Sequence, residues 1–273
     1  MASILILTFN EEINLARCLE SVKWSDDVVV LDSYSNDRTV KIAEEYGVRV
    51  IQRAFDNYSG QRSYGLDEIE YRHPWVLMVD ADEEVTPELA EEIQSLVSRE
   101  DSSITLYRFR RRDFFMGRWI KRSSGYPTWF GRLVKLGHIR IERIVNEEYV
   151  TDGEVGLLRN HVNHYPFNKG VAAWIDKHNR YSTMEAQLLI DKSLPELRFK
   201  DFFSRDPATR RIAVKALVYK LPGRPLLMFF ALYVFKGGFL DGLPGFIFCN
   251  LRAYYEFMID IKVREKKMRQ EEL

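Results

Sequence analysis

The sequence predicts an α/β fold with a mostly parallel sheet, followed by a helical C-terminal region. Apolar runs rich in Val, Ile and Leu occur at residues 4–7, 28–31, 49–51 and 75–79. Such runs are typical of parallel strands buried on both faces. Stretches with helical spacing of apolar residues separate them, and strands that alternate with helices form parallel sheets with right-handed crossovers. Helical patterns dominate from residue 169 to the end.

Capping residues mark the expected helices in chain order. Asn10 and Asp37 are placed to cap the first two helices, and Gly47 is placed to end the second. Thr86 followed by Pro87 is a strong helix start. The middle of the chain instead shows strand-like segments separated by glycine turns, at residues 104–111, 132–136 and 138–141. Later helices are expected to begin at Pro207 and to cover residues 226–235.

Composition limits the classes of protein that fit. The chain has 273 residues and zero net charge, so nothing in its bulk charge predicts nucleic-acid binding. Its 29% charged content argues against an integral membrane protein. Two distant cysteines and the absence of a basic, apolar leader pattern predict a protein of the reducing cytoplasm.

The chemistry-bearing residues follow the predicted strands. Neither GxGxxG nor GxxxxGK[ST] follows the first strand, so the dinucleotide and P-loop fingerprints are excluded. Instead, Asp32, Asp80 and Asp82 come at the carboxyl ends of predicted strands, where ligands bind in open α/β sheets. Carboxylates repel a diphosphate unless a hard cation such as Mg²⁺ or Mn²⁺ lies between them.

A structural interpretation of the same residues stays open at this point. Asp80 and Asp82 are also suitable residues for starting the turn before the Thr86 helix, and Asp32 alone fits a turn. Three acidic positions at the ends of neighbouring strands favour the binding interpretation.

Longer stretches carry a family resemblance. The segments ILTFNEEINLARCLESV, VVVLDSYSNDRTVKIAEEYG and WVLMVDADEEVTPEL resemble glycosyltransferase family 2, which has the GT-A fold, and within it the lipopolysaccharide-core glucosyltransferase branch. The likeness continues through GRLVKL, VNEEYV and HYPF and covers nearly the whole chain. It implies a catalytic domain over residues 1–165, with a nucleotide-binding half (1–100) and an acceptor half (101–165), and a helical extension over 166–273.

The resemblance also implies roles for individual residues. The donor would be a UDP-sugar, glucose in this branch, and the acceptor a heptose of the lipopolysaccharide inner core. Mn²⁺ or Mg²⁺ would bridge the donor diphosphate, held by Asp82 and by the later histidine His164, which is better placed than His161. The residues expected to contact the donor nucleotide are Thr8, Asn10, Glu11, Asp32, Arg62 and Asp80.

The expected catalytic base is Glu147. An inverting transfer needs a carboxylate that takes the proton from the acceptor hydroxyl. The related branch supplies it from a His-Glu pair, and the matching stretch here is Val145-Asn146-Glu147-Glu148. Asn146 departs from this pattern, and Glu148 is a competing carboxylate. Arg132 precedes this stretch and is a further candidate for an acceptor or phosphate contact.

The C-terminal region combines apolar and basic residues. From Arg198 onward there are fifteen Lys/Arg against eight Asp/Glu, and residues 226–235 carry no charge. Ten residues are too few to span a bilayer, but apolar faces with basic flanks suit a helix that lies at the membrane surface. We therefore expect residues 215–269 to contact the inner face of the cytoplasmic membrane. A buried core helix or a dimer interface is the alternative.

Other functions than sugar transfer to a lipopolysaccharide core fit parts of the same sequence. The acceptor could instead be a polyprenyl phosphate or a growing surface polysaccharide. A catalytically inactive sugar-nucleotide-binding membrane scaffold is an alternative from a different class, and Asn146 is its support. A nucleotidyltransferase would present a Gly/Lys/Arg-rich loop after the first strand, whereas residues 8–12 read TFNEE.

Overall fold

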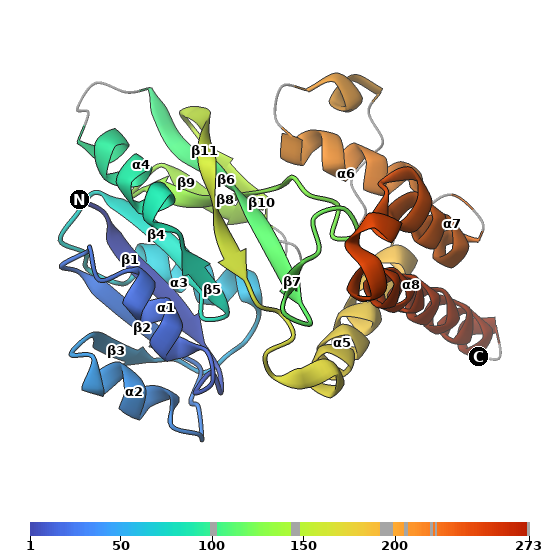
Figure 1. Ribbon diagram of the computed structural model, residues 1–273, viewed down its shortest axis with the longest axis horizontal. Coiled ribbons are helices and arrows are strands. Elements are labelled where there is room, and N and C mark those ends of the chain that lie inside the picture. The colour runs from blue at the N-terminus through green and yellow to red at the C-terminus, as the bar shows by residue number, and fades with distance from the viewer. Residues whose placement is uncertain are drawn as a thin grey trace. The chain divides into compact units, whose positions relative to one another are not determined.

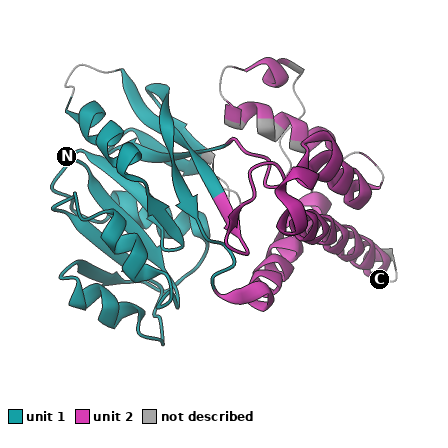
Figure 2. Cartoon of the chain, in the orientation of Figure 1, with its two compact units in different colours: residues 1–112, 128–168 teal, residues 113–127, 169–273 magenta. Residues whose placement is uncertain are grey.

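The computed structural model describes residues 1–98, 103–142, 148–191, 199–204, 207–218, 221 and 223–271. The chain divides into two compact units, which Figure 2 colours separately. Unit 1 holds residues 1–112 and 128–168, and unit 2 holds residues 113–127 and 169–273. The helical unit therefore begins three residues after the predicted boundary at 165, and it takes in a segment from the middle of the chain. The predicted division of the first domain at residue 100 stays a prediction.

Unit 1 is built on a mixed sheet whose parallel half matches the prediction (Figure 1). Four parallel strands lie in the order β3 (Arg49–Gln52), β2 (Val28–Asp32), β1 (Ser3–Thr8) and β4 (Trp75–Asp80). Thr8 pairs with Asp32 on one side of β1, and Leu7 pairs with Asp80 on the other. The carboxyl ends of three strands thus meet at one edge of the sheet.

The sheet continues beyond β4 with antiparallel strands. They follow in the order β8 (Thr128–Lys135), β6 (Ile104–Phe115), β11 (Glu154–His164) and β5 (Glu83–Val85), and β7 (Arg118–Trp119) pairs with β6. The sequence predicted β6 and β8 but missed β11 and β5. β5 directly follows the acidic end of β4 and pairs with β11, so that Glu83 lies opposite His164.

Two layers of helices and strands cover the two faces of this sheet. The buried core on one face includes side chains of α1 (Leu15–Ser21), α2 (Thr39–Glu45) and α4 (Pro87–Val97). On the other face the core takes side chains from α3 (Tyr58–Asp67) and from the hairpin of β9 (Ile139–Glu142) and β10 (Glu148–Thr151). The predicted strand at 138–141 corresponds to β9, whereas α3 was not predicted.

The helix starts differ in how well the sequence predicted them. Thr86 caps α4 as expected, because its Oγ1 accepts a hydrogen bond from Leu89 N at 3.3 Å and Pro87 follows. The prediction that Asn10 caps the first helix was wrong. α1 begins at Leu15, with Asn14 at the cap position. The Asn10 side chain instead accepts a hydrogen bond from Asn36 N at 2.9 Å.

α3 packs closely on the sheet through a glycine. A Cβ on Gly65 would lie 2.5 Å from Leu5 Cδ2, well inside normal van der Waals contact. The absence of a side chain at position 65 therefore allows α3 to approach β1. This approach matters for the site because α3 also carries Arg62.

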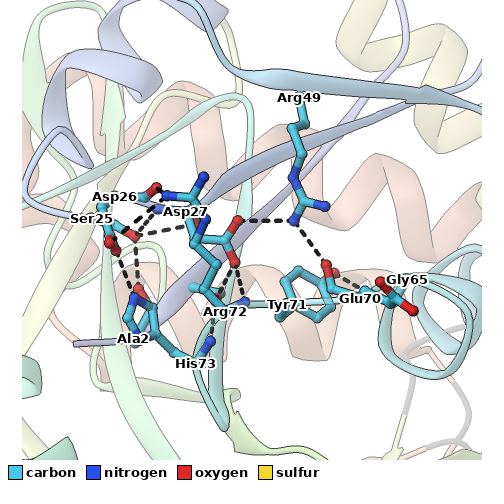
Figure 3. A network of polar contacts seen from close by, with 11 residues as sticks. Ala2, Ser25, Asp26, Asp27, Arg49, Gly65, Glu70, Tyr71, Arg72 and His73 are labelled. Atoms are coloured by element: carbon cyan, nitrogen blue, oxygen red, sulfur yellow. Dashed lines mark hydrogen bonds and ion pairs between the residues drawn. The ribbon is translucent and has the colours of Figure 1, made fainter.

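A polar network ties together the opposite edge of the sheet, where the parallel strands begin (Figure 3). The buried Asp27 carboxylate accepts hydrogen bonds from Ser3 Oγ at 2.6 Å and from Arg72 N at 2.8 Å. Arg49 donates to it at 2.9 Å. Burial alone would raise the pKa of Asp27, but these hydrogen bonds and the Arg49 charge lower it overall. Four segments of the chain are thereby joined away from the candidate site.

Unit 2 consists mainly of helices, as the sequence predicted. They are α5 (Gly170–Ile190), a 3₁₀ turn (Phe199–Phe203), α6 (Pro207–Val218), α7 (Arg224–Phe230), a π-helical turn (Ala231–Phe235), a second 3₁₀ turn (Gly238–Asp241) and α8 (Gly242–Glu271). Tyr255, Met258 and Ile259 of α8 pack against Tyr181 and Leu189 of α5. The buried Asp241 carboxylate accepts hydrogen bonds from Arg122 N at 2.8 Å and Ser123 N at 2.7 Å, and so fixes the segment 113–127 to this unit.

Length and apolar composition decide whether a helix is able to cross a bilayer. Within the described part of the chain, no one helix combines the length and the apolar composition that crossing a bilayer requires. Residues 224–235 and 238–270 satisfy these criteria only as a pair, and the two helical stretches are bent by 69° at the break between them.

Candidate active site

The site lies where β1, β2 and β4 end, and its first pair is Thr8 and Asp32. Both side chains are buried, and Thr8 Oγ1 donates a hydrogen bond to Asp32 Oδ1 at 2.9 Å. Asp32 Oδ2 accepts further hydrogen bonds from Ser35 N at 2.8 Å and Gln52 Nε2 at 3.1 Å. The carboxylate is therefore held by donors from three segments, which fixes its position at the strand end.

The loop after β1 is bound to the loop after β2. Asn10 adopts a left-handed conformation with φ of 54°, which asparagine tolerates better than most residues. Its backbone N donates to Ser35 Oγ at 2.8 Å, and Glu11 N donates to Thr39 Oγ1 at 2.7 Å. The predicted donor-binding residues Asn10 and Glu11 thus border Thr8 and Asp32.

Two buried arginines hold the Asp80 carboxylate. Arg62 of α3 donates to Asp80 Oδ1 at 2.6 Å, and Arg132 of β8 donates to Asp80 Oδ2 at 3.0 Å. Arg62 and Arg132 are only 3% and 6% exposed, whereas 28% of the Asp80 side chain is accessible. Two guanidinium groups that donate to different oxygens of one carboxylate fix its orientation. The negative charge of Asp80 is therefore compensated within the protein by Arg62 and Arg132.

The second aspartate of the Asp80-Ala81-Asp82 turn pairs with a histidine. His164 Nε2 lies 3.3 Å from Asp82 Oδ2, and both side chains are mostly buried. Tyr165 N also donates to the Asp82 carbonyl at 2.9 Å. The end of β11 thus brings together the two residues that the sequence predicted as metal ligands.

The Glu83 side chain stabilises this turn. Its Oε2 accepts a hydrogen bond from Asp80 N at 3.0 Å, and the side chain is buried. Burial, and next the Asp80 carboxylate, raise the pKa of Glu83. Burial also raises the pKa of the Cys18 thiol, with Glu83, Asp82 and Asp80 adding to the shift. Cys18 is therefore an uncharged packing residue beneath the acidic turn.

His161 occupies a different environment from His164. Burial, followed by the charges of Arg112 and Arg110, lowers the pKa of His161 to about 4. The residue is thus neutral at neutral pH, and its backbone carbonyl accepts a hydrogen bond from Thr86 Oγ1 at 3.0 Å. Of the two late histidines, His164 is the one beside Asp82.

The expected base, Glu147, lies outside the described residues, as does Asn146. The competing Glu148 begins β10, where it pairs with Glu142 of β9. The described part of this hairpin packs against α3, and Ser59 Oγ donates to the Ile141 carbonyl at 3.4 Å. Ser59 lies one turn before Arg62 on α3. The strands that flank Glu147 are therefore attached to the helix that supplies an arginine to Asp80.

Two residues contact Asp80 more closely than the sequence predicted. Arg132 was only a candidate acceptor or phosphate contact, and Glu83 was not singled out. An arginine inside the apolar run GRLVKL is a signal for Arg132, because an unpaired charge is rarely buried in a strand. Glu83 has no comparable signal, since an acidic residue after a strand is common.

Comparison with known proteins identifies the family. A family model described as Glycosyl transferase family 2 matches residues 3–163. The chain belongs to glycosyl transferase family 2. The matched region contains β1 to β11 up to Asn163, and so most of the site. The fold class and the family that the sequence predicted are confirmed.

Relatives of this family 2 protein align over almost its full length. It is 26% identical to the lipopolysaccharide core biosynthesis glycosyltransferase LpsC of Rhizobium meliloti (strain 1021), over 97% of this chain and 92% of LpsC. It is 25% identical to an uncharacterized glycosyltransferase of Rickettsia conorii, over 98% of this chain and 91% of that protein.

Solved structures match a smaller part of this family 2 chain. One is the glucosyl-3-phosphoglycerate synthase of Mycobacterium tuberculosis in complex with Mn²⁺, uridine-diphosphate and glucosyl-3-phosphoglycerate, with 21% identity and a TM-score of 0.35. The match covers 41% of this chain and 44% of the synthase chain.

Proposed function

We propose that this protein is an inverting, metal-dependent glycosyltransferase that transfers a sugar, glucose by resemblance, from a UDP-sugar to a lipopolysaccharide-core or related surface-glycan acceptor. Family membership supports glycosyl transfer, and the full-length similarity to LpsC supports the class of acceptor. The observation that carries the proposal is the grouping of Asp80, its two arginines and the Asp82–His164 pair at the carboxyl ends of the strands.

The nucleoside would lie over the ends of β1 and β2. Asp32 offers a carboxylate held in place by Thr8, Ser35 and Gln52. Such a fixed acceptor suits the N–H group of a uracil ring, since binding then requires little rearrangement. Asp80 is the next carboxylate along the edge and would accept a hydrogen bond from the ribose.

A divalent ion, Mn²⁺ or Mg²⁺, would be held by Asp82 and His164. The Asp82 carboxylate is a suitable ligand, because Mg²⁺ in such sites usually takes one or two carboxylates together with substrate phosphates and water. Among the residues the structure describes, no group of three or more His, Cys, Asp or Glu side chains converges on one point. Two protein ligands leave coordination positions for the donor diphosphate. The ion would stabilise the negative charge of the leaving diphosphate.

Glu147 would take the proton from the acceptor hydroxyl as that oxygen attacks the anomeric carbon. Attack from the face opposite the diphosphate inverts the configuration. The attachment of β9 to α3 next to Arg62 supports this role, because it ties the hairpin to the donor side of the sheet. Arg62 and Arg132 keep Asp80 oriented throughout, so the polar groups need little reorganisation during transfer.

Unit 2 would hold the enzyme at a membrane surface that carries the acceptor, through residues 215–269. Exposed apolar side chains on both sides of the bend support this, and Phe235 is the most exposed of them at 85%. Lys236 follows directly, and basic residues recur along α8. We place the enzyme in the cytoplasm, on the inner face of the cytoplasmic membrane, where nucleotide-sugar donors are available.

Transfer assays with two base variants test this function. Glu147→Gln should bind donor normally and lose transfer by about 10²-fold or more, whereas Glu148→Gln should retain most of it. The product of the wild type, examined by NMR, should have the anomeric configuration opposite to the donor. Normal transfer by Glu147→Gln would remove Glu147 from its role, and retention of configuration would contradict the inverting mechanism.

A further inference from the structure

A cationic cavity lies within the helical unit, and none of its lining residues belongs to the candidate active site. It has a volume of about 280 Å³ and lies among α5, the start of α7 and the last third of α8. Charged and apolar side chains of these elements line it, together with Leu221 and Gly223 before α7: Leu189, Arg224, Asp260, Val263, Arg264 and Lys267.

The charges around this cavity are unbalanced. Arg224 is 4% exposed and forms an ion pair with Asp260. Arg264 and Lys267 are exposed, and neither forms an ion pair within the described part of the chain. Among the described residues that line the cavity, one carboxylate therefore faces three cations. A phosphate monoester carries a charge of about −1.5 to −2 at pH 7, which matches the excess of two positive charges.

The surroundings of the cavity are apolar enough for a lipid. Leu189, Leu221 and Val263 form part of its wall. Next to it, Phe257, Ile261 and Met268 of α8 are each at least 46% exposed. Their spacing of four and seven residues places them on one face of the helix. Arg264 lies one turn from both Ile261 and Met268, so a cation of the cavity borders an exposed apolar stripe.

We infer that this cavity binds the phosphate monoester headgroup of a membrane lipid, with Arg264 and Lys267 as its direct contacts. The Arg224–Asp260 pair forms the floor of the cavity, and the apolar stripe of α8 lies against the acyl chains. This inference rests on the proposed contact of unit 2 with a membrane surface. It adds a defined headgroup site to what would otherwise be a general attraction of basic residues for anionic lipids.

Vesicle binding by the full chain tests the site with a matched pair of double variants. Arg264→Gln/Lys267→Gln removes the two cations of the cavity. Lys266→Gln/Arg269→Gln removes two charges from the same helix outside the cavity. The vesicles contain phosphatidylcholine together with either phosphatidic acid, which is a phosphate monoester, or phosphatidylglycerol, which is a phosphate diester. The proportion of each anionic lipid is adjusted until the two kinds of vesicle have the same zeta potential.

The wild type should bind the phosphatidic acid vesicles several-fold more tightly than the phosphatidylglycerol vesicles. The Arg264/Lys267 variant should lose this preference, and the Lys266/Arg269 variant should keep it. Equal loss of preference in both variants, or no preference in the wild type, would overturn the inference. Saturable binding of inorganic phosphate that depends on Arg264 and Lys267 would replace the lipid by a soluble phosphate ligand.

Calorimetry with UDP-glucose and Mn²⁺ separates this test from the proposed function. Both double variants should bind the donor like the wild type, because the substituted residues belong to unit 2 and the donor residues to unit 1. If the wild type fails to bind any donor, the proposed function fails while the vesicle result is unaffected. Loss of lipid preference with normal donor binding assigns the cavity to the lipid alone.

Discussion

The Arg62 guanidinium lies 2.6 Å from the Asp80 carboxylate, although α3 and β4 supply these residues separately. Arg132 holds the other carboxylate oxygen from a third element, β8. The first aspartate of the Asp80-Ala81-Asp82 turn is therefore oriented and charge-compensated by the protein itself. The second aspartate, Asp82, pairs instead with His164, and it is the residue that we propose as a metal ligand.

Replacing either arginine of this cluster should weaken donor binding. We expect Arg62→Gln and Arg132→Gln each to lower UDP-sugar affinity about tenfold or more, because Asp80 loses a charge-assisted hydrogen bond. Each should also cost about 1–3 kcal/mol of stability. Calorimetry and urea denaturation measure the two effects.

Arg72→Gln is the matched control for these arginines, since its side chain is 66% exposed and its segment lies at the opposite edge of the sheet. Donor affinities that are the same in Arg62→Gln, Arg132→Gln and Arg72→Gln would show that the cluster has no part in donor binding.

Removing the proposed metal ligand should change the metal dependence of binding. In Asp82→Ala, the increase in donor affinity that Mn²⁺ produces should fall by about tenfold or more. Affinity without metal should change little. Asp26→Ala is a suitable control, because this half-exposed carboxylate pairs with His73 away from the site. An unchanged Mn²⁺ effect in Asp82→Ala would exclude Asp82 as a ligand.

Asp27 should contribute to acid stability and not to activity. Its pKa is lowered in the folded protein, so the ionised form stabilises the fold above the unfolded-state pKa of about 4. That contribution is lost as the pH falls through the lowered folded-state pKa. Asp27→Asn should lower the free energy of unfolding at pH 7 by about 1–3 kcal/mol and flatten its pH dependence below pH 4.

Urea unfolding at several pH values, together with donor binding at pH 7, checks the Asp27 prediction. If the free energy of unfolding of Asp27→Asn depends on pH below pH 4 as strongly as that of the wild type, the assigned network is contradicted. Loss of donor binding in a folded variant would contradict the purely structural role of Asp27.

Gly65→Ala should destabilise the protein although alanine favours helices. The new methyl group would meet Leu5 Cδ2 at 2.5 Å and force α3 away from β1, at a cost of about 1–3 kcal/mol. In a Leu5→Val background the contact is smaller, so the same substitution should cost less. A double-mutant cycle measured by urea unfolding gives this coupling, and additive effects would show that the contact is unimportant.

The parallel half of the fold was predictable from sequence for a physical reason. Strands buried on both faces leave continuous apolar runs, and β1, β2 and β4 each end where such a run meets a polar residue. β11 was missed because its apolar and polar residues do not alternate: Val155 and Leu157 are exposed, whereas His161 and His164 are buried. α3 was missed because it has few apolar residues and approaches the sheet through Gly65.

The candidate site was predictable in its residue types but not in its pairing. Strand-end position alone indicated Asp32, Asp80 and Asp82. That Arg132 shares Asp80 with Arg62 depends on β8 lying next to β4, a long-range antiparallel pairing that no local pattern encodes. Likewise, His164 meets Asp82 only because β11 pairs with the short strand β5.

Calorimetric titration of the wild type with a panel of UDP- and GDP-sugars, with and without Mn²⁺, tests whether the protein binds a sugar nucleotide through a divalent ion. We expect saturable binding of one UDP-sugar that depends on Mn²⁺ or Mg²⁺, with GDP-sugars bound weakly or not at all. Absence of binding to every sugar nucleotide in the presence of metal would contradict the proposed glycosyltransferase function.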